Sequence, residues 1–251
     1  MTGAAGAIAT AVRPVLRELA EEVVLTDRIG VGSLEPGERF ERAELGDPAP
    51  WDALAAGCDA VVHLGAVPDE AAFDVLAGPN LHGVFHVFEA ARRAGVRRVV
   101  AASSGRVTGF YRVGERLDGD ATPRPDGLYG ATKAFSEALG RMYADKFGLE
   151  VVALRIGTFE ERPRTTRDLS TWLSHDDARR LVRAALTGPV AGFLAVYGAS
   201  ANTRRWWDVP EELGYEPVDD AEAYASDVAP DDGVPFQGGA NTSRASGGWA
   251  V

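Results

Sequence analysis

The sequence has little cysteine and no long apolar run. Cys58 is the only cysteine among 251 residues, so the chain cannot form an internal disulfide. Each apolar run is shorter than the roughly 18 residues that a membrane-spanning helix needs, so no membrane partner is expected. The N-terminal residues also lack the basic start of a signal peptide, which predicts a cytoplasmic protein.

Positive charge is scarce as well. The chain carries 37 acidic against 26 basic residues, a net charge of −11, and Lys133 and Lys146 are its only lysines. Such an acidic surface repels phosphate backbones, so nucleic acid is not an expected partner. No group of His, Cys and Asp has the spacing of a metal site, and no metal is expected.

Short apolar strands alternate with helix-forming segments through the first 157 residues. The strands are expected near 23–25, 60–64, 98–102 and 151–154, and the helices near 7–21, 50–57, 80–95 and 129–147. Uninterrupted apolar strands alternating with helices predict an α/β protein with a parallel sheet covered on both faces. Right-handed crossovers then give a doubly wound Rossmann fold. We therefore expect residues 1–157 to form a nucleotide-binding domain.

The pattern is looser after residue 157. A helix is expected near 176–187 and a strand near 193–197, followed by an acidic stretch rich in Gly and Pro. Ser174 or Asp176 is expected to cap that helix. We expect residues 158–251 to form a small substrate-binding region with a mobile tail at 238–251.

A Gly-rich turn opens the first helix at residues 3–9. Gly3 and Gly6 allow the backbone to approach a pyrophosphate, and the following helix N-terminus offers free N–H groups. Asp27 ends the next strand, where its carboxylate can bind the ribose hydroxyls and repel a 2′-phosphate. This favours NAD over NADP, although the adjacent Arg28 keeps NADP open.

The strand that precedes such a turn in a Rossmann fold is missing, because only Met1 and Thr2 stand before Gly3. Neighbouring strands would then hold unpaired backbone groups, each costing roughly 1–3 kcal/mol when buried. We expect a misassigned start. A chain extended upstream by about 6–10 residues, the length of one strand, should be more stable and bind cofactor more tightly.

Tyr129 and Lys133 form a Y-x-x-x-K pattern at the start of a predicted helix. This spacing puts both side chains on one helix face, where the ammonium should lower the phenol pKa and let the tyrosine act as a base. Ser104 ends the preceding strand and can join the tyrosine. Glu137, one turn further along, is expected to pair with Lys133.

These motifs resemble the extended short-chain dehydrogenase/reductase (NAD-dependent epimerase/dehydratase) superfamily. Further motifs resemble, in order and spacing, the NAD-dependent uronate dehydrogenases over nearly the whole chain. They are Arg124-Pro125-Asp126-Gly127-Leu128-Tyr129-Gly130, Ser170 to Asp177, Tyr197-Gly198-Ala199-Ser200-Ala201-Asn202, Trp206-Trp207-Asp208 and Phe236-Gln237-Gly238-Gly239.

The resemblance implies that Tyr129 deprotonates the anomeric hydroxyl of a sugar acid while hydride passes from C1 to NAD, giving an aldarolactone. Ser104 would steady the oxygen and Lys133 would hold the nicotinamide ribose. The implied cofactor contacts are Gly3, Gly6, Ala7, Ile8, Asp27, Leu45, Leu64, Gly65, Ala66, Asn80, Tyr129, Lys133 and Ile156. The implied substrate contacts are Ser104, Gly105, Arg106, Thr158 and Arg167, with the guanidinium of Arg167 on the sugar carboxylate. The resemblance also implies a homo-oligomer paired through the long helices.

Three positions depart from the family pattern. Gly105-Arg106 stands in place of Asn-His, and Pro68 in place of a serine, so polar groups that would surround the sugar hydroxyls are changed. Arg106 could instead meet a second anion or a phosphate. A dehydrogenase of another sugar or sugar phosphate, a sugar-nucleotide epimerase and a non-catalytic NAD sensor therefore remain alternatives.

Overall fold

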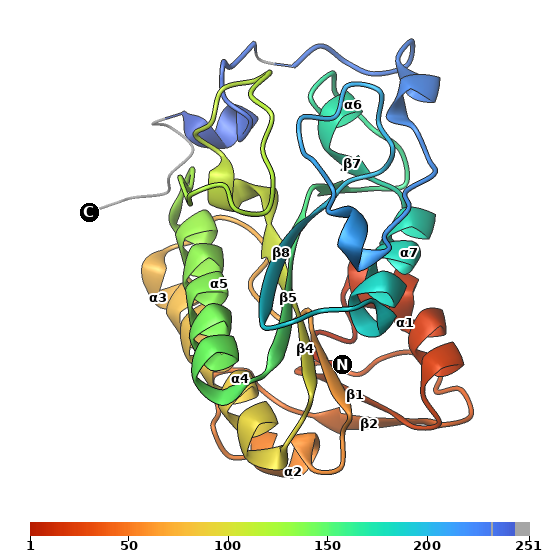
Figure 1. Ribbon diagram of the computed structural model, residues 1–251, viewed down its shortest axis with the longest axis vertical. Helices are drawn as coiled ribbons and strands as arrows, with labels where there is room; N and C mark the ends of the chain where they lie inside the picture. The colour runs from red at the N-terminus through yellow and green to blue at the C-terminus, as the bar shows by residue number, and fades with distance from the viewer. Residues whose placement is uncertain (232, 244–251) are drawn as a thin grey trace.

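A parallel sheet with helices on both faces forms the body of the protein (Figure 1). The computed structural model describes residues 1–231 and 233–243. The strands are β1 (Val23–Asp27), β2 (Glu38–Arg42), β3 (Ala60–His63), β4 (Arg98–Ser104), β5 (Glu150–Ile156) and β8 (Phe193–Gly198). Four of them lie in the order β3-β4-β5-β8, and β1 pairs with β2. The predicted doubly wound fold is confirmed.

Two helical layers cover the sheet (Figure 1). On one face α1 (Ala7–Leu19) packs beside α7 (His175–Thr187), and their apolar sides join the core with β1, β4 and β5. On the other face α4 (Gly83–Ala94) and α5 (Leu128–Phe147) pack against β4 and β5, and α2 (Trp51–Ala55) packs against α4. Ser174 caps α7 by accepting a hydrogen bond from the amide of Asp177 at 2.9 Å, as predicted.

The structure differs from the sequence expectation in several elements. β2 was not predicted, and an irregular π-helical segment at Ala77–His82 delays the start of α4. β4 includes both serines at its end instead of stopping before them. The remaining short elements are α3 (Phe73–Leu76), β6 (Thr158–Phe159), α6 (Asp168–Thr171), β7 (Trp172–Leu173) and 3-10 turns at Gly105–Thr108, Glu211–Leu213, Ala221–Tyr224 and Gly239–Thr242.

Met1 and Thr2 join the two parts of the sheet. Thr2 donates its amide to Val62 O at 2.9 Å and accepts from the amide of Leu64 at 3.3 Å, so it bridges to β3. The carbonyl of Met1 accepts from Thr26 N of β1 at 2.9 Å. Among the described residues these are the only two that stand between β1 and β3.

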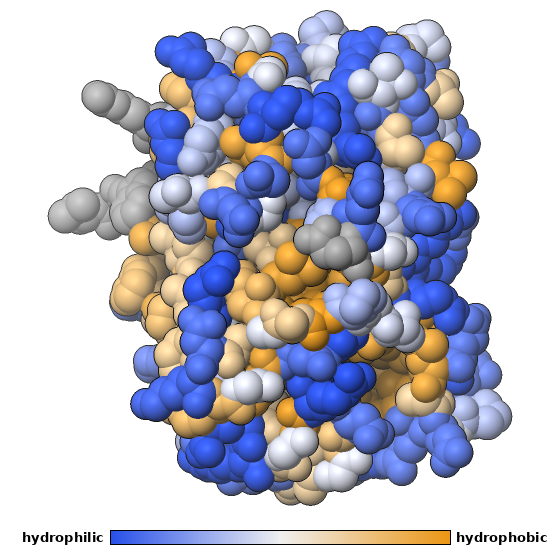
Figure 2. Space-filling view, in the orientation of Figure 1, coloured by the Kyte–Doolittle hydropathy of each residue, from blue (hydrophilic) through white to orange (hydrophobic). Residues whose placement is uncertain are grey.

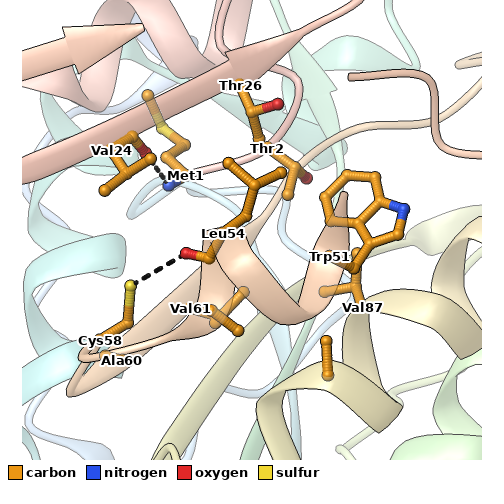
Figure 3. Close-up of a pocket in the computed structure, with 12 residues that line it drawn as sticks. Met1, Thr2, Val24, Thr26, Trp51, Leu54, Cys58, Ala60, Val61 and Val87 are labelled. Atoms are coloured by element: carbon orange, nitrogen blue, oxygen red, sulfur yellow. Dashed lines mark hydrogen bonds between the residues drawn. The ribbon is translucent and has the colours of Figure 1, made fainter. Parts of the chain in front are cut away.

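An apolar pocket of about 40 Å³ is lined in part by Met1 and Thr2 and lies between β1 and β3, beneath α2 (Figure 3). Its walls include Val24, Trp51, Leu54 and Val61. The amino group of Met1 donates to Val24 O at 2.6 Å, and burial lowers the pKa of this amino group to about 6. A gap in the middle of the sheet is therefore bordered by apolar side chains and one buried amine.

The chain after β8 covers the carboxyl ends of the strands (Figure 1). Gln237 is buried there: its amide oxygen accepts from Trp207 Nε1 at 2.8 Å, and its amide nitrogen donates to Glu115 O at 2.8 Å. Gly238 N donates to Gly109 O at 2.8 Å, so the start of the expected mobile tail is bonded to the body. Residues 244–251 of that tail lie outside the described residues.

Hydrophilic residues cover the top of the molecule, and apolar residues gather in the middle of the face that Figure 2 shows. None of the helices in the described part of the chain is long and apolar enough to cross a membrane.

Candidate active site

Tyr129, Lys133 and Ser104 meet where β4 ends beside the first turns of α5. All three side chains are buried. Tyr129 and Ser104 share a hydrogen bond. Lys133 Nζ donates to Ala102 O at 2.8 Å and lies 5.6 Å from the centroid of the Tyr129 ring. The structure thus brings the three expected catalytic residues together.

The pKa of Tyr129 differs from the sequence expectation. Burial raises it to about 12, while the hydrogen bond from Ser104 and the charge of Arg106 act in the opposite direction. Burial also lowers the pKa of Lys133 to about 8. The expected lowering of the phenol pKa is therefore not found in this state, because desolvation of the ring outweighs the charges around it.

Arg106 lies over the Tyr129 ring and is surrounded by carboxylates. Its Cζ is 5.3 Å from the ring centroid. Its guanidinium donates to Asp126 at 2.8 Å, to Glu70 at 2.9 Å and to Asp69 at 3.0 Å. The second anion that the sequence suggested for Arg106 is thus supplied by the protein's own acidic side chains. The local sequence around Arg106 does not predict this arrangement, because those carboxylates come from other segments of the chain.

Glu137 does not pair with Lys133 as expected. Its carboxylate accepts from Ser103 Oγ at 2.5 Å and from Arg155 Nε and Nη2 at 2.9 and 2.8 Å. Arg155 also lies against the buried Tyr197. The i, i+4 pairing fails because Lys133 turns toward the Ala102 carbonyl, whereas Glu137 faces the sheet.

The expected cofactor residues gather at the carboxyl ends of β1 and β3. Ala5 N donates to Asp27 Oδ2 at 3.1 Å, which ties the Gly-rich turn to the end of β1. Gly3 has a φ of +68°, and a Cβ there would lie 2.6 Å from Gly65 N, so only glycine fits between the two turns. Gly65 N also donates to Thr2 Oγ1 at 3.1 Å.

This region fits a dinucleotide. The first turn of α1 has no acidic residue and no side-chain cap, so its N–H groups remain free for a phosphate. Ala7 and Ile8 begin that helix. The other expected contacts lie around it. A Cβ at residue 65 would lie 3.0 Å from Leu45 Cδ1, Leu64 and Ala66 flank Gly65, and Ile156 ends β5 opposite Ser104.

Asn80 fixes the loop that follows β3. Its side-chain oxygen accepts from Val67 N at 2.8 Å, and its side-chain nitrogen donates to Val67 O and to Thr132 Oγ1, both at 3.1 Å. Asn80, which the family resemblance places among the cofactor contacts, thus ties this loop to the helix turn that carries Lys133.

Arg167 differs from Arg106 in having no acidic partner within ion-pair distance among the described residues. It donates to Gln237 O at 2.7 Å, and it lies 3.4 Å from Thr158 Oγ1. Burial lowers its pKa. A pocket of about 230 Å³ opens beside it, lined also by Trp206 and Phe236. A buried guanidinium of this kind is suited to bind an anion.

Comparisons with known proteins agree with this geometry. The model of the NAD dependent epimerase/dehydratase family matches residues 1–211. The uronate dehydrogenase of Pseudomonas putida is 41% identical over 250 residues, covering 96% of this chain and 93% of its own. That of Agrobacterium fabrum is 42% identical over 249 residues, covering 95% and 94%. A mutant uronate dehydrogenase from Agrobacterium tumefaciens, complexed with NAD, superposes with a TM-score of 0.91 at 41% identity, covering 96% of this chain and 95% of its own. The chain therefore belongs to the NAD dependent epimerase/dehydratase family.

Proposed function

We propose that this protein is an NAD-dependent dehydrogenase that oxidises the anomeric carbon of a uronate to an aldarolactone. The observation that carries the substrate class is the difference between its two site arginines. Arg106 forms ion pairs with three carboxylates, whereas Arg167 is buried and, in the described part of the chain, has no carboxylate within ion-pair distance. A single uncompensated guanidinium fits a substrate with one carboxylate.

The cofactor in this proposal is NAD, which accepts the hydride from C1 when it is bound. Gly3, Gly6 and the first turn of α1 would hold its phosphates, and Asp27 would bind the adenosine ribose. The carboxylate of Asp27 would repel a 2′-phosphate and so disfavour NADP.

Tyr129 would take the proton from the anomeric hydroxyl as the C1–H bond breaks and the C1–O bond becomes a carbonyl. Ser104 would donate a hydrogen bond to that oxygen. Because burial raises the pKa of Tyr129 to about 12, the phenolate needs nearby positive charge, which Lys133 and Arg106 supply. Turnover should therefore rise with pH until Tyr129 is ionised.

The residues after 157 would hold the sugar. Thr158 and Arg167 lie together beneath the segment around Gln237, and Gly239 approaches the Arg167 side chain. The carboxylate of the uronate would bind Arg167, while C1 would lie between Tyr129 and the nicotinamide.

We also propose a homo-oligomer that pairs through α4 and α5. Phe85, Phe135 and Met142 are 46%, 40% and 38% exposed on these two helices. Large apolar side chains gathered on neighbouring helices are typical of a subunit interface.

A substrate panel tests the proposed reaction. NADH formation is followed with uronates, the matching neutral aldoses and aldose phosphates, using wild type and Arg167→Met. We expect uronates to have the highest kcat/KM, and the variant to lose about 10–100-fold on them through loss of a charged hydrogen bond. The loss on neutral aldoses should be about tenfold smaller. Equal losses on both sugars, or preferred turnover of an aldose phosphate, would contradict the assignment.

A further inference from the structure

The helix that carries Tyr129 is capped by a residue from a distant loop. Gly127 precedes α5 and has no side chain to accept from the free amides of the first turn. Glu70 takes this place: its Oε1 accepts from Leu128 N at 2.8 Å and its Oε2 from Tyr129 N at 3.3 Å. A carboxylate at this end of a helix also interacts favourably with the helix dipole.

The local backbone leaves room for this contact. A Cβ at residue 127 would collide with Glu70 Oε2, so glycine lets the carboxylate reach the helix end. The loop is fixed just before Glu70, because Asn80 bonds both backbone groups of Val67. Only 14% of the Glu70 side chain is exposed. The carboxylate is therefore held in place from both sides.

Glu70 also holds Arg106. Oε2 of Glu70 accepts from Arg106 Nη2 at 2.9 Å, while Asp126 accepts from Arg106 Nε at 2.8 Å. These two anchors keep the guanidinium over the Tyr129 ring, 5.3 Å from its centroid. One carboxylate thus bonds the backbone of Tyr129 and the cation that lies on its ring.

We propose that Glu70 is a positioning residue for Tyr129, which sets the first turn of α5 and holds Arg106 against the phenol. The proposal rests on the proposed role of Tyr129 as the base. Asp69 provides a natural comparison: it also binds Arg106, at 3.0 Å, but its side chain is 80% exposed and, among the described residues, it makes no hydrogen bond to α5.

The pH dependence of kcat distinguishes the role of Glu70 from that of Asp69. Arg106 favours the phenolate, so releasing it should raise the pKa of Tyr129 and move the acid limb of the kcat profile to higher pH. Asp69 raises the pKa of Tyr129, so removing its charge should leave the limb in place or move it to lower pH. Loss of Glu70 and loss of Asp69 therefore have different expected signs.

The experiment compares Glu70→Ala, Glu70→Gln, Arg106→Met and Asp69→Asn on the best substrate of the panel. For Glu70→Ala we expect kcat to fall about tenfold, with KM within about twofold and an upward shift of the acid limb. Glu70→Gln keeps an acceptor for the amides but not the charge, so it should recover part of kcat and keep the shift. The double variant Glu70→Ala/Arg106→Met should show the same shift of the acid limb as Arg106→Met alone.

Amide hydrogen exchange gives a readout that needs no substrate. Glu70→Ala should accelerate exchange in the first turn of α5, and Asp69→Asn should not. Failure of the uronate assignment would appear as inactivity of the wild type, which leaves this readout intact. The positioning role is overturned if Glu70→Ala leaves both the exchange and the pH profile unchanged, or if it lowers only the melting temperature.

Discussion

The two parts of the sheet are held together very differently. β4 pairs with β5 and β5 with β8 in continuous parallel registers, and α4 and α5 pack on them through a closed apolar cluster. In the described part of the chain, the backbone hydrogen bonds that join β1 to β3 run through Met1 and Thr2, which line an apolar pocket of about 40 Å³. The proposed catalytic groups stand on the first part, and the expected dinucleotide site spans the seam between the two.

The difference indicates which part of the sheet is rigid and which part is less stable. Tyr129, Lys133 and Ser104 are held by a helix and strand that many partners fix, which suits groups that must keep their geometry. The Gly-rich turn and Asp27 lie on the loosely joined side, so binding of NAD should stabilise the seam. Perturbing each side should therefore have different consequences for stability and for cofactor affinity.

The largest expected effect is on the catalytic side. Glu137→Ala removes one partner of the buried pair with Arg155 and leaves a guanidinium without compensation. Breaking such a pair costs about 3–5 kcal/mol, or about 6–20 °C in melting temperature for a chain of this size. Asp52→Asn, which breaks the exposed pair with Arg93, is the matched control and should cost less than about 1 kcal/mol. Equal melting temperatures for the two variants would contradict this description.

A smaller effect of opposite sign is expected at the seam. The pairing of β1 with β2 and of β3 with β4 leaves some backbone groups facing the gap between β1 and β3. They are the amides of Val24 and Val62 and the carbonyl of Ala60. An extension of about six apolar residues before Met1 should form hydrogen bonds with these groups and pack into the gap, raising stability by about 2–4 kcal/mol at about 1 kcal/mol for each new hydrogen bond. NAD should also bind more tightly. An extension of equal length with proline at the paired positions is the control, and equal stability of both would show that the gap is not a strand site.

Much of the fold follows from local sequence. Uninterrupted apolar strands such as Val151–Leu154 and the alternation with helices predict the parallel sheet, and both site serines lie near the expected strand end. β2 was missed because Glu38–Arg42 is mostly charged, as an edge strand can be when it pairs on one side only. The extent of α4 was misjudged because an irregular turn precedes it.

The candidate site also has features that the sequence predicts and features that it does not. The spacing of Tyr129 and Lys133 within one helix is visible in the sequence. The surroundings of Arg106 are not, since its partners Asp69, Glu70 and Asp126 come from segments 20 to 37 residues away. Glu70 has no local signal at all, because it caps a helix 58 residues further along the chain. The raised pKa of Tyr129 depends on burial, which spacing does not reveal.

The most direct test of the account is turnover of a uronate by Tyr129→Phe, with NAD affinity measured in parallel. Removing the hydroxyl should lower kcat by about 10²–10⁴-fold, because the variant lacks the proposed general base. NAD affinity should fall far less than kcat, since most of the proposed cofactor contacts, including Gly3, Gly6 and Asp27, are untouched. Turnover near that of the wild type in the variant would contradict the assignment of Tyr129 as the base.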